Sequence, residues 1–389
     1  MLRISILLAA GGGFIFMLIL AKYWNPIEYG DFVREYSLIS YLSFPILYGL
    51  IPQMLRSTAI NMSTNVFRLL GNYKGFLAIY GVGVCAILIV ASSGFIAFLV
   101  HFGCLIIILA SGLGEAQLRR RAQFQTVFFS RAIGIATSIL MVVVILSAQL
   151  SRTALDGLIM RVLPSAALLA VVFMLTSQKG DRKPAQIGGK SSHGGQWVGV
   201  IESTTIALTI GIFQYALLIA GSRIVEPAKF VGLSVGLTVS ITVSQKLIEP
   251  HVFRLFDRER SSLHIVLDEL GTTGFWWFLE LFMFSYCALI AVEFLLQEHM
   301  DFLQAFCLSV GAAMASIAYI VHTAIYVYSK ALKFSIFQLT LFGAALVVLV
   351  LSNVEELFAV LFLIMAAAYL YFARRQLQAT VITNVNGMK

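Results

Sequence analysis

The first candidate for chemistry in this sequence is an arginine inside an apolar segment. Arg161 lies three residues before Pro164, in a run from 153 to 176. Charged side chains within membrane segments are costly, so they are functional candidates by default. The planar guanidinium carries donors whose spacing matches phosphate oxygens. The other interpretation is that Arg161, about two turns from the outer end of its segment, extends its side chain to the membrane surface.

Glu202 and Glu280 are the acidic residues that lie well inside apolar segments. Each could bind a coupling proton or a sodium ion, because loss of hydration makes an isolated carboxylate take up a cation. Each could equally be a structural partner that neutralises Arg161 or Lys246 between helices. The sequence leaves these two interpretations open.

Two basic residues occupy corresponding places in the two halves of the chain. Arg56 and Arg254 each follow an apolar segment at its expected inner end. Together with Lys246 and Arg3, they could form a basic mouth that recruits an anionic group. The simpler interpretation is ordinary membrane topology, because cytoplasmic loops are enriched in lysine and arginine.

Two lone histidines lie in apolar stretches of the chain, His101 and His322. A lone histidine has no neighbouring ligand in the sequence with which to form a metal site. Packing or a helix–helix hydrogen bond is therefore the simpler explanation for both.

The composition is that of a membrane protein. Hydrophobic residues make up 59% of the chain and charged residues 12%. A soluble domain carries roughly 25% charged residues, so this chain has too little polar surface to cover a globule in water. Apolar runs of about 20 residues, each long enough to cross the hydrocarbon core, recur along the chain. We expect an all-α polytopic membrane protein, because a helix satisfies its own backbone in lipid.

Hydropathy, with breaks at glycine, proline and charge clusters, predicts about twelve transmembrane helices. The expected spans are roughly 3–22, 36–54, 75–92, 94–114, 131–149, 153–176, 197–221, 228–246, 270–296, 303–328, 331–352 and 356–373. An even number of spans places both termini on the same side of the membrane.

Lysine and arginine indicate which side that is. With the N-terminus in the cytoplasm, 21 of the 27 basic residues fall on the inner side, 5 fall on the outer side, and Arg161 falls within a span. Short cytoplasmic loops carry such an excess, so we expect both termini in the cytoplasm. Because the net charge of +8 is concentrated in loops on one side of the membrane, nucleic acid is not an expected partner.

The chain is expected to consist of two repeats of one helical bundle. Pro26-Ile27-Glu28-Tyr29, in the first outer turn, is echoed by Pro227-Ala228-Lys229-Phe230. A polar, glycine-rich segment then separates six spans from six. Both halves start on the cytoplasmic side, so the two bundles should be pseudo-symmetric about an axis along the membrane normal. The predicted parts are a first six-helix bundle, a cytoplasmic linker, a second six-helix bundle and a cytoplasmic tail, at 1–176, 177–196, 197–376 and 377–389.

The opening hairpin resembles a known family. The residues that carry the likeness are Lys22-Tyr23-Trp24-Asn25-Pro26-Ile27-Glu28-Tyr29-Gly30-Asp31-Phe32, followed by Tyr36-Ser37-Leu38-Ile39-Ser40. They are similar to the opening of bacterial polysaccharide flippases, the Wzx-type O-antigen and capsule members of the multidrug, oligosaccharidyl-lipid and polysaccharide exporter superfamily. Twelve spans in a 6+6 arrangement extend the likeness to the whole chain at the level of architecture.

The resemblance implies a carrier and not an enzyme. Such a flippase moves a polyprenyl-pyrophosphate-linked oligosaccharide from the cytoplasmic to the outer leaflet of the bacterial inner membrane, for surface polysaccharide biosynthesis. The implied partners are this lipid, the surrounding membrane lipid, and a polysaccharide polymerase with its chain-length machinery. No cofactor or metal is implied. In this interpretation Arg161 holds the pyrophosphate, and the basic mouth recruits it.

Two alternative functions remain at this stage. A cation-coupled multidrug exporter of the same superfamily would share the twelve spans, although the basic bias of the candidate cavity favours the flippase. A membrane polysaccharide polymerase or ligase would carry a sizeable outer loop with catalytic residues, and no expected outer loop reaches twenty residues. The sequence shows no nucleotide-binding loop, metal cluster or nucleophile motif. Energy would therefore come from an ion gradient, from substrate removal or from a partner.

Overall fold

The structure is a computed structural model that describes residues 15–51, 70–120, 124–147, 153–177, 193–238, 274–296, 302–328, 332–352, 354 and 356–386. All regular secondary structure within these residues is helical. The all-α prediction is therefore confirmed for the described part of the chain. Helices are the expected outcome for apolar segments that must satisfy their backbone hydrogen bonds internally.

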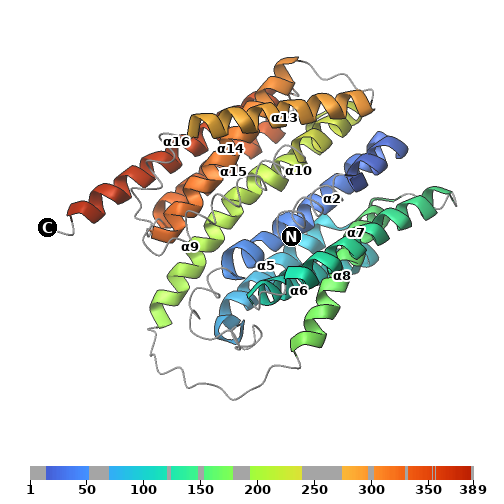
Figure 1. Cartoon of the computed structure of the whole chain (residues 1–389), viewed down its shortest axis with the longest axis horizontal. Helices are drawn as coiled ribbons and strands as arrows, with labels where there is room; N and C mark the ends of the chain where they lie inside the picture. The colour runs from blue at the N-terminus through green and yellow to red at the C-terminus, as the bar shows by residue number, and fades with distance from the viewer. Residues whose placement is uncertain are drawn as a thin grey trace. The chain divides into compact units, whose positions relative to one another are not determined.

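Within the described residues of the first half, five long helices are present, as Figure 1 illustrates. Residues 15–23 form a helix that ends just before the first turn. The elements that follow are α2 (Pro26–Phe44), the π-helical turn η1 (Pro45–Leu50), the 3-10 turn η2 (Gly71–Tyr73), α5 (Lys74–Ala91), α6 (Phe95–Arg120), α7 (Phe124–Ser147) and α8 (Ala154–Ser177).

The described part of the second half begins with α9 (His193–Gly211), which continues through the π-helical turn η3 (Ile212–Ala216) into α10 (Leu217–Ile224). Residues 227–238 form a helix directly after α10. The elements that follow are α13 (Gly274–Leu296), α14 (Phe302–Tyr328), α15 (Leu332–Ser352) and α16 (Glu356–Asn386) (Figure 1).

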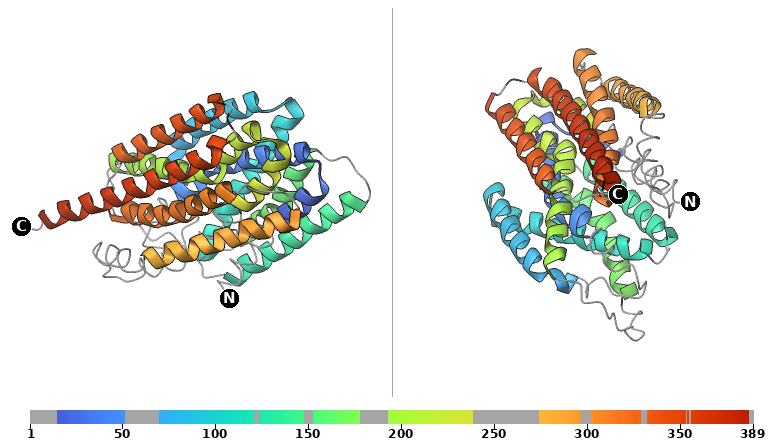
Figure 2. Two further views of the ribbon diagram at one scale, coloured as in Figure 1. Left: turned by 90° about the horizontal axis from the view of Figure 1, so that it is seen from above. Right: turned by 90° about the vertical axis from the view of Figure 1, so that its left-hand side faces the viewer.

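These helices follow the predicted spans, and the largest differences in length are at α2 and α16. α2 begins ten residues before the expected 36–54, because Asn25 and Pro26 start a helix at the turn itself. α16 continues beyond the expected end at 373, through the segment expected to be a tail. No glycine or proline interrupts the sequence from Glu356 to Asn386, so nothing local ends the helix. Figure 2 shows this last part of α16 extending past the helices beside it toward the C-terminus.

Length and composition support a multi-pass membrane protein. Five described helices are long and apolar enough to cross a bilayer: Lys74–Ala91, Phe95–Ala116, Gln125–Ser147, Gly274–Leu296 and Leu357–Arg375. Large apolar side chains are exposed along them, for example Val90 at 88% and Phe294 at 84%. Such exposure suits lipid and not water. The total of twelve spans stays a prediction.

The chain divides into two compact units, Met1–Tyr23 with Glu35–Ala207, and Trp24–Arg34 with Leu208–Lys389. In the first unit, α6 packs against α7 and α8. The start of α9 belongs there too, because Val200 packs with Ile46, Leu50 and Leu113. In the second unit, α14 packs against α13 and α16.

The two echoing sequence motifs adopt the same local structure. Pro26 and Pro227 each occupy the first position of a helix, where a missing N–H costs nothing. Three residues later, the amides of Tyr29 and Phe230 each donate to the carbonyl four residues before them, at 3.0 and 2.8 Å. Both rings are fully buried. Phe230 also lies against Gly30, so the two turns are in contact within the second unit.

The π-helical turn η1, which follows α2, lies close to the backbone of α9. A Cβ built on Gly49 would lie 2.9 Å from the Cα of Thr204, so only glycine fits. Pro45 at the start of η1 cannot donate to the helical ladder. Tyr80 of α5 donates a hydrogen bond to the carbonyl of Leu42 in the preceding turn. The hydroxyl of a neighbouring side chain thus hydrogen-bonds a backbone carbonyl beside the irregular turn. In a membrane segment, backbone polar groups need such partners.

We predict that Gly49→Ala destabilises the fold, because the added methyl would collide with backbone and not with a flexible side chain. The expected loss is about 1–3 kcal/mol of unfolding free energy. The measurement is unfolding by SDS titration in mixed micelles. The matched control is Gly81→Ala on α5, where a Cβ meets nothing within 4 Å. That control should be neutral or stabilising, because alanine favours helix over glycine. Equal stability of the two variants would contradict the close approach.

Candidate functional site

Arg161 of α8 lies between aromatic rings of two other helices. Its guanidinium carbon is 5.7 Å from the ring centroid of Phe16, on the helix at 15–23, and 5.6 Å from that of Tyr36, on α2. These distances are within the range of cation–π attraction. The side chain is partly buried, and Phe16 is almost wholly so. Three helices of the first unit therefore position this one positive charge.

An apolar cluster holds these helices together beside the arginine. Leu158 and Val162 flank Arg161 on α8, and both are buried. They pack with Ile39 of α2 and Leu105 of α6. The turn of α8 that carries Arg161 is thus anchored in a buried apolar cluster.

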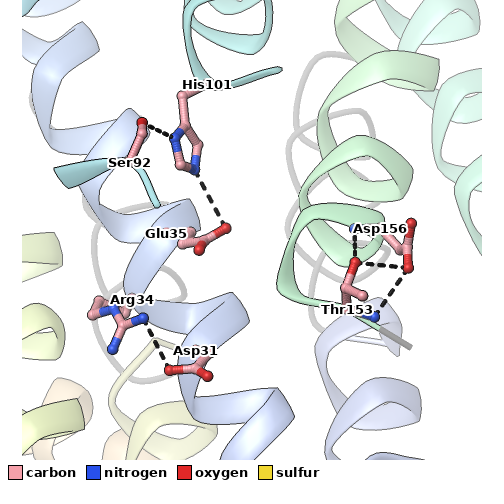
Figure 3. A network of polar contacts seen from close by, with 7 residues as sticks. All are labelled: Asp31, Arg34, Glu35, Ser92, His101, Thr153 and Asp156. Carbon is pink, nitrogen blue, oxygen red and sulfur yellow. Dashed lines mark hydrogen bonds and ion pairs between the residues drawn. The ribbon is translucent and has the colours of Figure 1, made fainter. Parts of the chain in front are cut away.

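A second polar group lies at the α5–α6 turn (Figure 3). The His101 side chain on α6 is only 2% exposed. Its Nδ1 is 2.8 Å from the Ser92 hydroxyl, and its Nε2 is 3.3 Å from a carboxylate oxygen of Glu35 on α2. The helix–helix hydrogen bond expected for His101 is therefore confirmed. Its partner was not predicted, because it lies 66 residues away in the sequence.

Two further polar contacts in Figure 3 join residues that are close in the sequence. Asp31 and Arg34 form an ion pair at 3.0 Å within one helical turn, and their side chains are 43% and 38% exposed. Thr153 caps the start of α8: its hydroxyl accepts from the Asp156 amide at 3.2 Å, and its own amide donates to the Asp156 carboxylate at 3.0 Å. This reciprocal arrangement is a capping box, which fixes where the helix of Arg161 begins.

An ion pair joins α6 to α7 at the other end of the first unit's helices. Arg131 donates to the carboxylate of Glu115. The two side chains are 26% and 12% exposed, so the pair is less hydrated than Asp31–Arg34. Burial makes each partner depend on the other, because either charge alone would be left in a poorly hydrated place.

The structure describes only some of the site residues expected from sequence. Glu280 is exposed on α13, and Glu202 lies on α9 at a position whose side chain is outside the described part. Arg3, Arg56, Lys246 and Arg254 lie outside the described residues, so the basic mouth stays a prediction. Among the described residues, no group of three or more His, Cys, Asp or Glu could hold a metal ion.

Sequence reasoning missed Glu35 and the two aromatic partners of Arg161. Glu35 precedes the expected second span and reads as an ordinary interfacial acid. Phe16 and Tyr36 read as apolar filling of their segments. No linear spacing links these residues to His101 or Arg161, because each contact joins different helices.

The sequence was also compared with known proteins. No family model matches the sequence, and no curated protein matches it.

We predict that Glu115 and Arg131 are energetically coupled more strongly than Asp31 and Arg34. A double-mutant cycle with alanine at each position, measured as unfolding free energy in mixed micelles, gives the two coupling energies. The exposed pair should give about 0.2–1 kcal/mol. The α6–α7 pair should exceed it, because it is less hydrated and joins two helices. A coupling energy for Glu115–Arg131 no larger than that of the control pair would contradict this assignment.

Proposed function

We propose that the protein is an alternating-access flippase. Its substrate would be a polyprenyl-pyrophosphate-linked oligosaccharide, carried from the cytoplasmic to the outer leaflet of the bacterial inner membrane for surface polysaccharide biosynthesis. The observation that carries the proposal is the placement of Arg161, partly buried among apolar helices and held against the Phe16 and Tyr36 rings.

The way Arg161 is held suits an anionic ligand. Aromatic faces stabilise a guanidinium from above or below its plane. Stacking uses the faces of the guanidinium, whereas phosphate oxygens bind its in-plane N–H groups, so the two interactions can coexist. A pyrophosphate head group would therefore meet a preformed positive charge, while its polyprenyl tail stayed in the bilayer.

The equivalent local structure of the Pro26 and Pro227 turns supports the duplicated architecture of such a carrier. Many secondary transporters are built from repeats that move against each other around a central site. The motif at the first turn is also the one that resembles polysaccharide flippases. Architecture and motif thus favour the same class, and Arg161 favours the anionic-lipid member of it over the exporter of cationic drugs.

We predict that the turn between α5 and α6 faces outward and the segment 177–196 faces the cytoplasm. The test uses a variant without native cysteines and with one new cysteine, at Ser93 or at Gly188. A membrane-impermeant maleimide should label Ser93→Cys on intact cells, whereas Gly188→Cys should require permeabilised cells. The reverse pattern would overturn the orientation given by the 21 inner basic residues.

We predict that Arg161→Ala slows lipid exchange about ten- to hundred-fold, the loss expected for hydrogen bonds to a charged group. Proteoliposomes would carry a polyprenyl-pyrophosphate oligosaccharide, with an external glycosidase reporting its arrival in the outer leaflet. Arg161→Lys should restore only part of the rate, because lysine keeps the charge and loses the planar fork.

The matched control for that assay is Arg34→Ala, which removes an exposed arginine paired with Asp31. It should exchange lipid at the wild-type rate. Equal rates for Arg161→Ala and Arg34→Ala would remove Arg161 from the site. A wild-type protein that moves no lipid, yet moves cationic drugs against a proton gradient, would replace the flippase with the exporter.

A further inference from the structure

A buried histidine lies between one hydroxyl and one carboxylate in the first unit. His101 on α6 contacts the Ser92 hydroxyl at 2.8 Å through Nδ1 and the Glu35 carboxylate at 3.3 Å through Nε2 (Figure 3). The carboxylate is 21% exposed, so it connects the buried ring to the surface of the unit. The group is at the same end of α6 as the α5–α6 turn, the end expected to face outward.

This group can hold its hydrogen bonds in two protonation states without moving a heavy atom. An ionised carboxylate only accepts, so Nε2 carries a hydrogen toward Glu35 and Nδ1 of the neutral ring accepts from Ser92. When the ring takes up a proton, Nδ1 donates to Ser92 instead, and the hydroxyl rotates to accept. Histidine is the side chain whose charge changes most readily near neutral pH.

Among the described residues of the helices around the ring, the other charges apart from Arg161 are paired locally or lie far along their helix. On α2, Asp31 and Arg34 pair with each other. On α8, Asp156 is held by the Thr153 cap. On α6, Glu115 lies fourteen residues from His101, which is about 21 Å along the helix. On α5, Lys74 is eighteen residues from Ser92, or about 27 Å. Glu28, also on α2, accepts a hydrogen bond from the Asn25 amide at 3.4 Å, and Arg119 and Arg120 lie at the far end of α6.

A short path links the histidine to Arg161 of α8. Glu35 is followed on α2 by Tyr36, whose ring contacts the Arg161 guanidinium. Ile39 of α2 packs with residues of α6 and α8 in one cluster. One turn of α2 therefore carries both Glu35, which pairs with His101, and Tyr36, whose ring lies against Arg161.

We propose that Glu35, Ser92 and His101 form a reversible proton-binding site, and that its occupancy changes the affinity of the Arg161 region for a pyrophosphate group. Without the proton, the site carries the single negative charge of Glu35. With the proton, imidazolium and carboxylate neutralise each other. Loading the site removes a net negative charge on the turn of α2 that also carries Tyr36, and this strengthens the binding of an anion at Arg161. The second part of this inference rests on the proposed function, whereas the first part does not.

The geometry favours a proton over a sodium ion at this place. Hard cations bind through several oxygen ligands. Here the Ser92 hydroxyl oxygen and one Glu35 carboxylate oxygen each contact an imidazole nitrogen, and the imidazole ring is a base that binds protons. The coupling ion sought at Glu202 and Glu280 from sequence would then be a proton, bound at a different pair.

The first experiment needs no substrate. The protein, with ¹⁵N-labelled histidine, is placed in nanodiscs, and its six histidines are followed by NMR between about pH 5 and 8. His101→Gln assigns the signal. Wild-type His101 should change reversibly from the Nε2–H tautomer to imidazolium. In Glu35→Gln, which keeps shape and hydrogen bonding, the imidazolium-to-imidazole ratio at a given pH should fall about ten-fold.

The control on the same helix is Glu28→Gln, which should leave the ratio unchanged. A His101 that stays in one state throughout, or that responds identically in wild type and Glu35→Gln, would overturn the proton site. Either result would show a structural hydrogen bond only, because the isosteric amide preserves that bond and removes only the charge.

The second experiment tests the link to Arg161. Farnesyl pyrophosphate is titrated into detergent-solubilised protein by calorimetry in buffers of different ionisation enthalpy. Because linkage is reciprocal, wild type should take up a fraction of a proton more per ligand bound than His101→Gln does. Equal proton uptake would overturn the coupling. If wild type binds no farnesyl pyrophosphate, the proposed function fails, while the NMR result still decides the proton site.

Discussion

A positive charge in an apolar helical bundle must be compensated by the chain itself, because hydrocarbon provides neither water nor counter-ions. Two ring faces from neighbouring helices contribute to this compensation at Arg161. The same constraint explains the Glu115–Arg131 pair and the placement of His101 between a hydroxyl and a carboxylate. Buried serines obey it locally: their hydroxyls donate to carbonyls one turn earlier, as at Ser138, Ser309 and Ser316.

The type of compensation decides what a buried charge can do. A carboxylate beside an arginine would neutralise it and compete with an incoming anion. Aromatic faces lower the cost of burying a guanidinium and leave its in-plane N–H groups available for hydrogen bonds. In the first unit, Glu115–Arg131 joins α6 to α7, whereas Arg161 lies against rings from two other helices; we propose that Arg161 binds a ligand.

Hydropathy and turn residues predicted most of the helices, because span length and helix capping are local properties of the sequence. The sequence predicted the hairpin at 92–94, the start of α8 at Thr153 and the paired turns at Pro26 and Pro227. It did not predict which helices contact each other. The pairing of His101 with Glu35 depends on which faces of α2 and α6 meet, and no linear pattern encodes that. The length of α16 was underestimated, because the hydropathy criterion ends a span at the first charged residues. A helix can continue through charged residues, and α16 does so.

We propose that the Arg161 region recognises a pyrophosphate group on a lipid. Native mass spectrometry can measure this recognition when the protein is released from detergent with equal amounts of an undecaprenyl-pyrophosphate glycolipid and the same glycolipid lacking the pyrophosphate. Wild type should retain the pyrophosphate lipid in preference, and Arg161→Ala should lose this preference while still retaining membrane lipid. Equal retention of the two glycolipids by wild type, or an unchanged preference in Arg161→Ala, would show that Arg161 does not recognise the pyrophosphate.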